Sequence, residues 1–338
     1  MITLNQAIKF SVVIALIYGT VLASCHLFSE SEVMTPPILN IKLGSLTSKN
    51  ILAWFDSWAT LKDMSQSERL QLLLEENKWK NSLVMWLFPQ AVQDALPHIV
   101  HTWLRCWILC AAVYFGVGAL WAYYGYFCFG DKLYAPGAIP AWKDVAEQIK
   151  VSNWSMPLYS VLPTLAEMAA EKGWTKAYPR IDNVGLPLYI LYFFLYMTSV
   201  EFCVYWMHRL LHEIKWAYKY LHLDHHKYNK EHTLSAFAGL AFHPIDGILQ
   251  ALPYAWTLFY CPMHFLTHEI LLFATGVWTA NIHDNIHGNV WPVMGAGYHT
   301  VHHTNYKTNY GHYFVFMDHI FGTLERPEDY EQRKLKAQ

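Results

Sequence analysis

Charged residues are scarce in this chain, and neither sign is in excess. Asp, Glu, Lys and Arg make up 15% of its 338 residues, whereas an average soluble domain contains about 25%. The formal net charge of −2 excludes the basic surplus that is typical of nucleic-acid-binding proteins. Hydrophobic residues contribute 54% and aromatic residues 16% of the chain. This composition favours an integral membrane protein.

Sequence motifs for common cofactors are also missing. The six cysteines form neither a CxxC pair nor a zinc-finger spacing, so we expect them to be reduced and structural. No GxGxxG follows a predicted strand, and the chain has no P-loop and no flavin or haem signature. Electrons for any redox reaction must therefore come from a separate donor.

Long apolar runs predict membrane-spanning helices. Residues 106–129 and 186–207 are each long enough to cross a bilayer at about 1.5 Å per residue. Residues 10–28 predict either a first span or a signal sequence. Residues 247–280 are apolar but are broken at Pro262, which favours a hairpin of two helices. Residues 140–180 are amphipathic, as is typical of a segment that lies at the membrane interface.

No internal repeat or flexible linker divides the chain. We therefore predict an N-terminal extension (residues 1–95), one all-α membrane domain (residues 96–330) and a charged tail (residues 331–338). Within the extension, the charged stretch at residues 62–80 predicts a surface helix.

Histidines are concentrated in one part of the chain, because 16 of the 19 lie between His208 and His319. Residues three or four apart are neighbours on a helix, so each group of such histidines presents its imidazoles in one direction. Ten histidines form four such groups: His208/His212, His222/His225/His226, His283/His287 and His299/His302/His303.

Ten imidazoles nearly fill the coordination positions of two octahedral ions, so the sequence predicts a di-metal site. Imidazole suits iron, zinc, copper and nickel, and the spacing does not distinguish iron from zinc, which could replace iron in purified protein. Two ferrous ions can reduce dioxygen and oxidise an unactivated C–H bond, whereas zinc has no redox chemistry. A site beside membrane spans predicts a lipid substrate. The alternative is a metal transporter, but its ligands would lie within several spans near the midplane.

Acidic residues near these groups are candidates for orienting the imidazoles. Glu201 lies in an apolar run, about two turns before His208, and a carboxylate in such a place is usually paired or functional. We consider two interpretations: a hydrogen bond to a ligand imidazole, or an ion pair with Arg209 or Lys215. Three aspartates are further candidates: Asp224, Asp284 and, more weakly, Asp318.

The pair His264/His268 lies in the apolar hairpin. We expect these two imidazoles to pack or to lie at the interface, not to bind metal.

The residues around the histidines resemble the fatty acid hydroxylase/sterol desaturase superfamily, and most closely its plant-type sterol C5(6)-desaturases. The resemblance covers residues 96–326, about two thirds of the chain. It rests mainly on residues 205–209, 218–222, 237–244, 278–284, 291–299 and 309–313.

The resemblance implies an enzyme with two iron ions that introduces the C5(6) double bond into Δ7-sterols, in sterol biosynthesis. It implies dioxygen as oxidant, and cytochrome b5 with its NAD(P)H-dependent reductase as the source of electrons. It also implies all ten grouped histidines as ligands. A sterol C4-methyl oxidase or a fatty-acid or sphingoid hydroxylase of the same superfamily is the alternative, and residues 233–250 favour the C5(6)-desaturases.

The same resemblance implies a multi-pass helical bundle in the endoplasmic reticulum membrane, with a cytosolic histidine-rich di-metal cap. The C-terminal Lys334 and Lys336 resemble a cytosolic retrieval signal for that compartment. If the histidines face the cytosol, we expect Leu186 and a loop that holds Asn153 to lie in the lumen.

Overall fold

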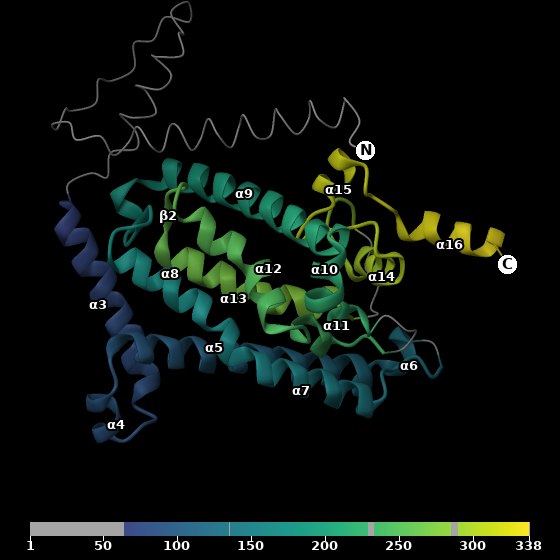
Figure 1. Ribbon diagram of the computed structural model, residues 1–338, viewed down its shortest axis with the longest axis horizontal. Helices are drawn as coiled ribbons and strands as arrows, with labels where there is room; N and C mark the ends of the chain where they lie inside the picture. Colours follow the sequence, from purple (N-terminus) through teal and green to yellow (C-terminus); the bar gives the residue numbers. More distant parts are fainter. Residues whose placement is uncertain (1–63, 135, 229–232, 285–289, 338) are drawn as a thin grey trace, which may run out of the picture.

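The computed structural model describes residues 64–134, 136–228, 233–284 and 290–337 (Figure 1), so the apolar run at residues 10–28 lies outside the described residues. The described chain is predominantly helical, as predicted. Two short parallel strands pair Ala177 with Met263 and Tyr178 with His264.

The larger elements are α3 (Gln66–Met85), α4 (Gln90–Ala95), α5 (His98–Ala122), α7 (Trp142–Tyr159), α8 (Val161–Glu171), α9 (Leu186–Glu213), α12 (Pro244–Thr257), α13 (Phe265–Ile282), α14 (Ala296–Asn305), α15 (Phe316–Phe321) and α16 (Pro327–Ala337). Shorter elements are the π-helical η1 (Tyr123–Cys128) and η3 (Tyr218–His222), the 3₁₀-helical η2 (Ile181–Asn183) and η4 (Ala236–Leu240), α6 (Gly130–Leu133), α10 (Lys215–Ala217), α11 (Leu223–His226), β1 (Ala177–Tyr178) and β2 (Met263–His264).

Two helical segments of the described chain are long and apolar enough to cross a membrane. They are His98–Cys128, which joins α5 to η1, and Leu186–Glu213, which is α9. Both predicted spans are therefore present as helices. The first begins before residue 106, and the second continues beyond residue 207 to include two of the grouped histidines. The break at Pro262 separates α12 from α13, as the hairpin prediction required.

The two long helices, α5 and α9, run in the same direction, from the α3 end of the molecule to the end that carries the histidines (Figure 1). At one end of the molecule, His98 Nε2 at the start of α5 lies 2.9 Å from Glu171 Oε1 at the end of α8. At the other end, the Tyr126 hydroxyl donates to Asp284. Between these ends α7 and α8 run back along α5 (Figure 1), and both helices pack against it.

The sequon at Asn153 lies inside α7 and not in a loop. In the same helix, Glu147 Oε1 pairs with Lys227 Nζ at 3.0 Å. Lys227 directly follows His225-His226. The start of α7 is therefore beside the histidine-bearing segment, and the expectation that Asn153 lies in a loop is wrong.

Helix α3 is the predicted surface helix on one face only, where Glu68, Glu75 and Lys78 are exposed. It buries four polar side chains where it packs against α5 and α8: Arg69, Asn77, Lys80 and Asn81. Lys80 Nζ lies 2.5 Å from Glu269 Oε2 of α13, so a charge that the sequence pattern assigns to solvent has a buried partner. The packed body therefore begins before residue 96, the expected start of the membrane domain.

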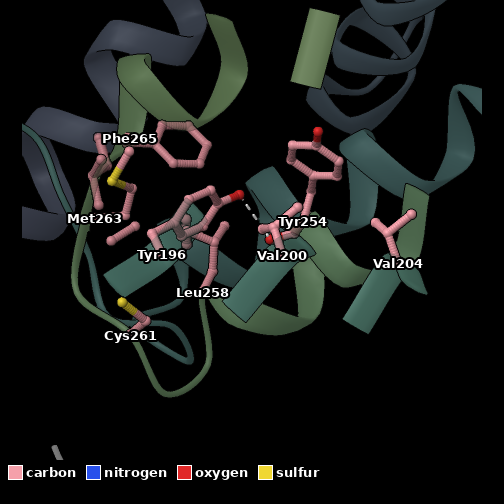
Figure 2. Close-up of a cluster of buried hydrophobic side chains, with 11 residues drawn as sticks. Tyr196, Val200, Val204, Tyr254, Leu258, Cys261, Met263 and Phe265 are labelled. Atoms are coloured by element: carbon pink, nitrogen blue, oxygen red, sulfur yellow. Dashed lines mark hydrogen bonds between the residues drawn. The ribbon is translucent and has the colours of Figure 1, made fainter. Parts of the chain in front are cut away.

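One ridge of α9 connects the hydrophobic core to the histidines. Tyr196, Val200 and Val204 follow one another at four-residue spacing and are buried against α12 (Figure 2), where the Tyr196 hydroxyl donates to the Tyr254 carbonyl oxygen at 3.1 Å. The same four-residue spacing continues into His208 and His212. Residues at this spacing share a helix face. The packing that fixes the rotation of α9 therefore also aims these two imidazoles.

Candidate metal centre

Nine of the ten grouped histidines lie together, and they form two sets. In each set one ring nitrogen per histidine lies within 4.8 Å of all the others. The tenth, His287, lies outside the described residues. The first set contains His208, His212, His222, His226 and His302, and the second contains His225, His283, His299 and His303.

Short contacts between histidine ring nitrogens indicate what the sets can hold. The Nε2 atoms of His226 and His212, of His226 and His222, and of His283 and His225 are each 3.1 Å apart. Two nitrogens bound at adjacent positions of one octahedral ion, each at about 2.1 Å, would lie about 3.0 Å apart. The buried Nε2 atoms of His208 and His302 have no hydrogen-bond partner among the described residues. The donor sets therefore fit metal ions.

Hydrogen bonds on the opposite ring nitrogen fix the orientation of four imidazoles. His222 Nδ1 lies 2.7 Å from Asp246 Oδ2, and both side chains are fully buried. The Nδ1–H groups of the other three donate to backbone carbonyl oxygens: His208 to Tyr310 at 3.1 Å, His283 to Thr279 at 2.7 Å and His302 to Thr308 at 2.8 Å. A proton on Nδ1 leaves Nε2 free as a metal ligand.

Burial keeps the imidazoles outside the long helices neutral, which is the form that binds metal. Burial and the neighbouring imidazoles lower the pKa of His302 to about 3. The same causes hold the pKa of His225 well below its ordinary value. Both side chains therefore remain uncharged at neutral pH.

Irregular helical turns bring the four groups together. The helix after α9 changes to a π-helical turn at Tyr218–His222 and then continues as α11, and such turns often occur at functional sites. His283 caps the C-terminal end of α13, while α14 carries the last three of the grouped histidines, His299, His302 and His303. In Figure 1 these short elements gather at the end of the molecule opposite α3.

Glu201 has a different role from either predicted one. Its buried carboxylate accepts hydrogen bonds from three successive backbone N–H groups, those of His312, Tyr313 and Phe314, at 3.0–3.2 Å. Arg209, proposed as its ion-pair partner, instead binds Glu213 at 2.7 Å. Glu201 therefore anchors the loop after α14 to the middle of α9.

Asp318 holds the beginning of the same loop. Its carboxylate accepts from the N–H groups of Tyr310 and Gly311, each at 2.8 Å, and Tyr310 supplies the carbonyl that orients His208. Burial raises the pKa of Asp318 to about 6. This aspartate acts on a ligand imidazole through the backbone, and not by direct contact.

The other candidate side chains lie apart from the two sets. Asp224 is exposed, and Asp284 accepts from the hydroxyls of Tyr126 and Tyr134. His268 Nδ1 bonds the Tyr196 hydroxyl at 2.7 Å in the core, and His264 Nε2 bonds the Pro179 carbonyl, which agrees with the packing role expected for that pair.

Asp246, which orients His222, was not among the predicted site residues. Its only indication in the sequence is the presence of a carboxylate within the mostly apolar run 244–255.

An apolar cavity leads to the histidines. Its inner part is lined by four of them, His208, His225, His283 and His299, and so reaches both sets. Its outer part lies between α5, α8, α12 and α13 and has mostly hydrophobic walls. The two parts adjoin, because both are lined by five residues: Leu240, Phe242, Gly247, Ala251 and Thr275.

Comparison with known protein sequences identifies the family to which the chain belongs. Residues 193–323 match the fatty acid hydroxylase family, and the chain belongs to that family. It is 49% identical to the Delta(7)-sterol-C5(6)-desaturase of Nicotiana tabacum, over 79% of this chain and 98% of that protein. It is 47% identical to the putative Delta(7)-sterol-C5(6)-desaturase 2 of Arabidopsis thaliana, over 80% of this chain and 95% of that protein.

The likeness extends to an animal protein. Human lathosterol oxidase is 33% identical over 55% of this chain and 63% of its own length. The two plant matches extend over 267 and 269 residues, which is more than the stretch from residue 96 to residue 338 contains. Each match therefore includes part of the predicted N-terminal extension. No solved structure matches the chain. These matches confirm the resemblance to the sterol desaturases.

Proposed function

We propose that this protein is a membrane-bound Δ7-sterol C5(6)-desaturase. The observation that carries the proposal is the apolar cavity that ends at two histidine sets, in a chain 49% identical to a Delta(7)-sterol-C5(6)-desaturase. Two iron ions held there would supply the oxidising power for C–H bonds, with dioxygen as oxidant. The chain's own histidines would hold the ions, and the hydrogen bonds on the opposite ring nitrogens orient four of these ligands.

Each histidine set would hold one iron ion. The first set combines His208/His212 from α9, the i,i+4 pair His222/His226, and the middle histidine of α14, His302. The second set mirrors it with the i,i+4 pair His299/His303, the middle histidine of the other triple, His225, and His283. From the sequence pairing of His283/His287, which resembles that of His208/His212, we propose His287 as a further ligand of the second ion.

The proposed reaction also requires electrons from outside the chain. Removing two hydrogens from the sterol while dioxygen becomes two water molecules requires two further electrons and two protons. Cytochrome b5 and its NAD(P)H-dependent reductase are the electron donors we propose, because no nucleotide or haem motif is present in the chain.

The parallel directions of α5 and α9 require a return crossing, which we assign to α7 and α8. We propose, from the resemblance to the sterol desaturases, that the histidine end faces the cytosolic side of the endoplasmic reticulum membrane.

Expression in a yeast strain that lacks its own C5-desaturase tests the activity. We expect Δ5,7-sterols to reappear in the sterol profile. A stably expressed protein that yields none refutes the proposal. Consumption of 4-methyl sterols, or hydroxylated lipids, would indicate one of the related activities instead.

Metal analysis of the purified protein tests the two-ion site. We expect about two ions per chain, with iron in the active form. His302→Ala and His225→Ala remove a ligand from different sets, so each should lower the metal content and abolish activity. The exposed His319 is a matched control, since His319→Ala should leave both ions in place. One ion in the unaltered protein would contradict the assignment.

A further inference from the structure

One buried histidine at the cavity belongs to neither set. His312 lines the inner part of the cavity together with His208 and His283. Its side chain is almost fully buried, and its Nε2 atom has no hydrogen-bond partner among the residues that the structure describes. Buried polar atoms are nearly always paired. A ligand in the cavity would be the missing partner.

The backbone of His312 is held firmly in place. Its N–H donates to Glu201 Oε1 at 3.0 Å, and its carbonyl oxygen accepts from the indole N–H of Trp278 at 2.7 Å. These two contacts tie the loop to α9 and to α13. A side chain on a backbone that is fixed from both sides needs less ordering when a ligand binds, and so can discriminate between ligands.

We propose that His312 recognises the hydroxyl group of the sterol and so positions the reacting bond beside the metal centre. This inference rests on the proposed function. In a sterol, one ring carbon separates the hydroxyl-bearing carbon from the C5(6) bond, so both must lie at the same end of the cavity. A neutral imidazole has one donor and one acceptor nitrogen. Either can bond a hydroxyl group.

The other end of the cavity suits the rest of the molecule. Its outer part is lined by hydrophobic side chains such as Val113, Leu272 and Phe273, from α5 and α13. The sterol would enter with its hydroxyl end first and leave its alkyl chain among these residues. The polar groups at the inner end would then distinguish a sterol from an alcohol-free hydrocarbon of the same shape.

Direct binding and turnover together test this role. We would measure the binding of a radiolabelled Δ7-sterol and of its 3-deoxy analogue to the purified protein in detergent, for the unaltered chain, His312→Leu and His312→Gln. We expect the unaltered protein to prefer the sterol, and His312→Leu to bind it about tenfold more weakly, close to its affinity for the analogue. His312→Gln, which keeps a donor and an acceptor, should recover part of the preference.

Turnover should change in the same sense, with a raised KM, a smaller change in kcat and an unaltered metal content. His319→Leu, an exposed substitution in the adjacent helix α15, should change neither binding nor turnover. Unchanged discrimination in a folded His312→Leu protein overturns the inference, as does loss of an ion, which would make His312 a ligand.

The outcomes separate the two proposals. Binding discrimination that depends on His312, in a protein that makes no Δ5,7-sterol, would refute only the reaction.

Discussion

Replacing Asp246 with asparagine should weaken metal binding without unfolding the protein. Asp246 Oδ2 lies 2.7 Å from His222 Nδ1, and both side chains are fully buried. Asparagine has nearly the same shape and can still accept the Nδ1–H bond, but it lacks the negative charge that makes the imidazole a stronger ligand. Loss of such a partner typically lowers metal affinity or activity by about 10- to 100-fold, which corresponds to about 1.4–2.7 kcal/mol.

Alanine at the same position should have a larger and different effect. It would leave the buried Nδ1–H of His222 unpaired and would also remove the acceptor for the Gln250 amide, which is 3.0 Å from Asp246 Oδ1. An unpaired buried donor costs about 1–3 kcal/mol. We therefore expect Asp246→Ala to lower the thermal unfolding temperature, whereas Asp246→Asn should mainly lower the metal content.

The assay compares metal per chain, thermal unfolding and sterol product for the purified variants. Asp224→Asn is the matched control, because Asp224 is an exposed aspartate within the same histidine triple. Equal metal content and equal activity in Asp246→Asn and in the unaltered protein would refute the reasoning. So would the same loss in the Asp224 control, since it would indicate an effect of net charge alone.

Three further substitutions test the surrounding structure. Glu201→Gln places an amide against three backbone N–H donors, so we expect about 2 kcal/mol less stability by thermal unfolding, and lower activity. Gly311→Ala should reduce product formation, because its Cβ would overlap a backbone carbonyl oxygen, whereas Gly116→Ala meets nothing within 4 Å and should not. Lys80→Met removes the nearer of two cations from the buried carboxylate of Glu269, which keeps Arg105 at 3.6 Å, and should cost about 2 kcal/mol, measured by chemical unfolding.

Each of these expectations has a contrary result. Unchanged unfolding of the Glu201 variant would mean that the loop after α14 is held by other contacts. Equal activity of the two alanine variants would show that the close approach at Gly311 is not needed. An unaffected Lys80 variant would indicate that α3 contributes little to the stability of the packed body.

Local sequence patterns predicted the structure well where helix formation depends on neighbouring residues alone. The two long apolar runs and the break at Pro262 predicted helices that the structure contains. Patterns failed where a polar group meets a distant partner. The charges of α3 predicted a solvent-exposed face, which holds for Glu68, Glu75 and Lys78 but not for Lys80, which is paired with Glu269, 189 residues later. Glu201 was expected to pair with a ligand imidazole or with a basic side chain, but its partners are the backbone groups of a loop.

The sequence by itself determined which ten imidazoles are candidates and that each group faces one side of a helical turn. Only the tertiary structure divided the nine described imidazoles between two sets, and it split both triples. His225 lies in the set of His299 and His303, and His302 lies in the set of His222 and His226. Residues at i and i+4 lie about 40° apart around a helix, whereas the residue at i+3 lies about 100° from the one at i+4. Which direction meets which neighbouring helix depends on packing between distant segments, and no local spacing encodes that.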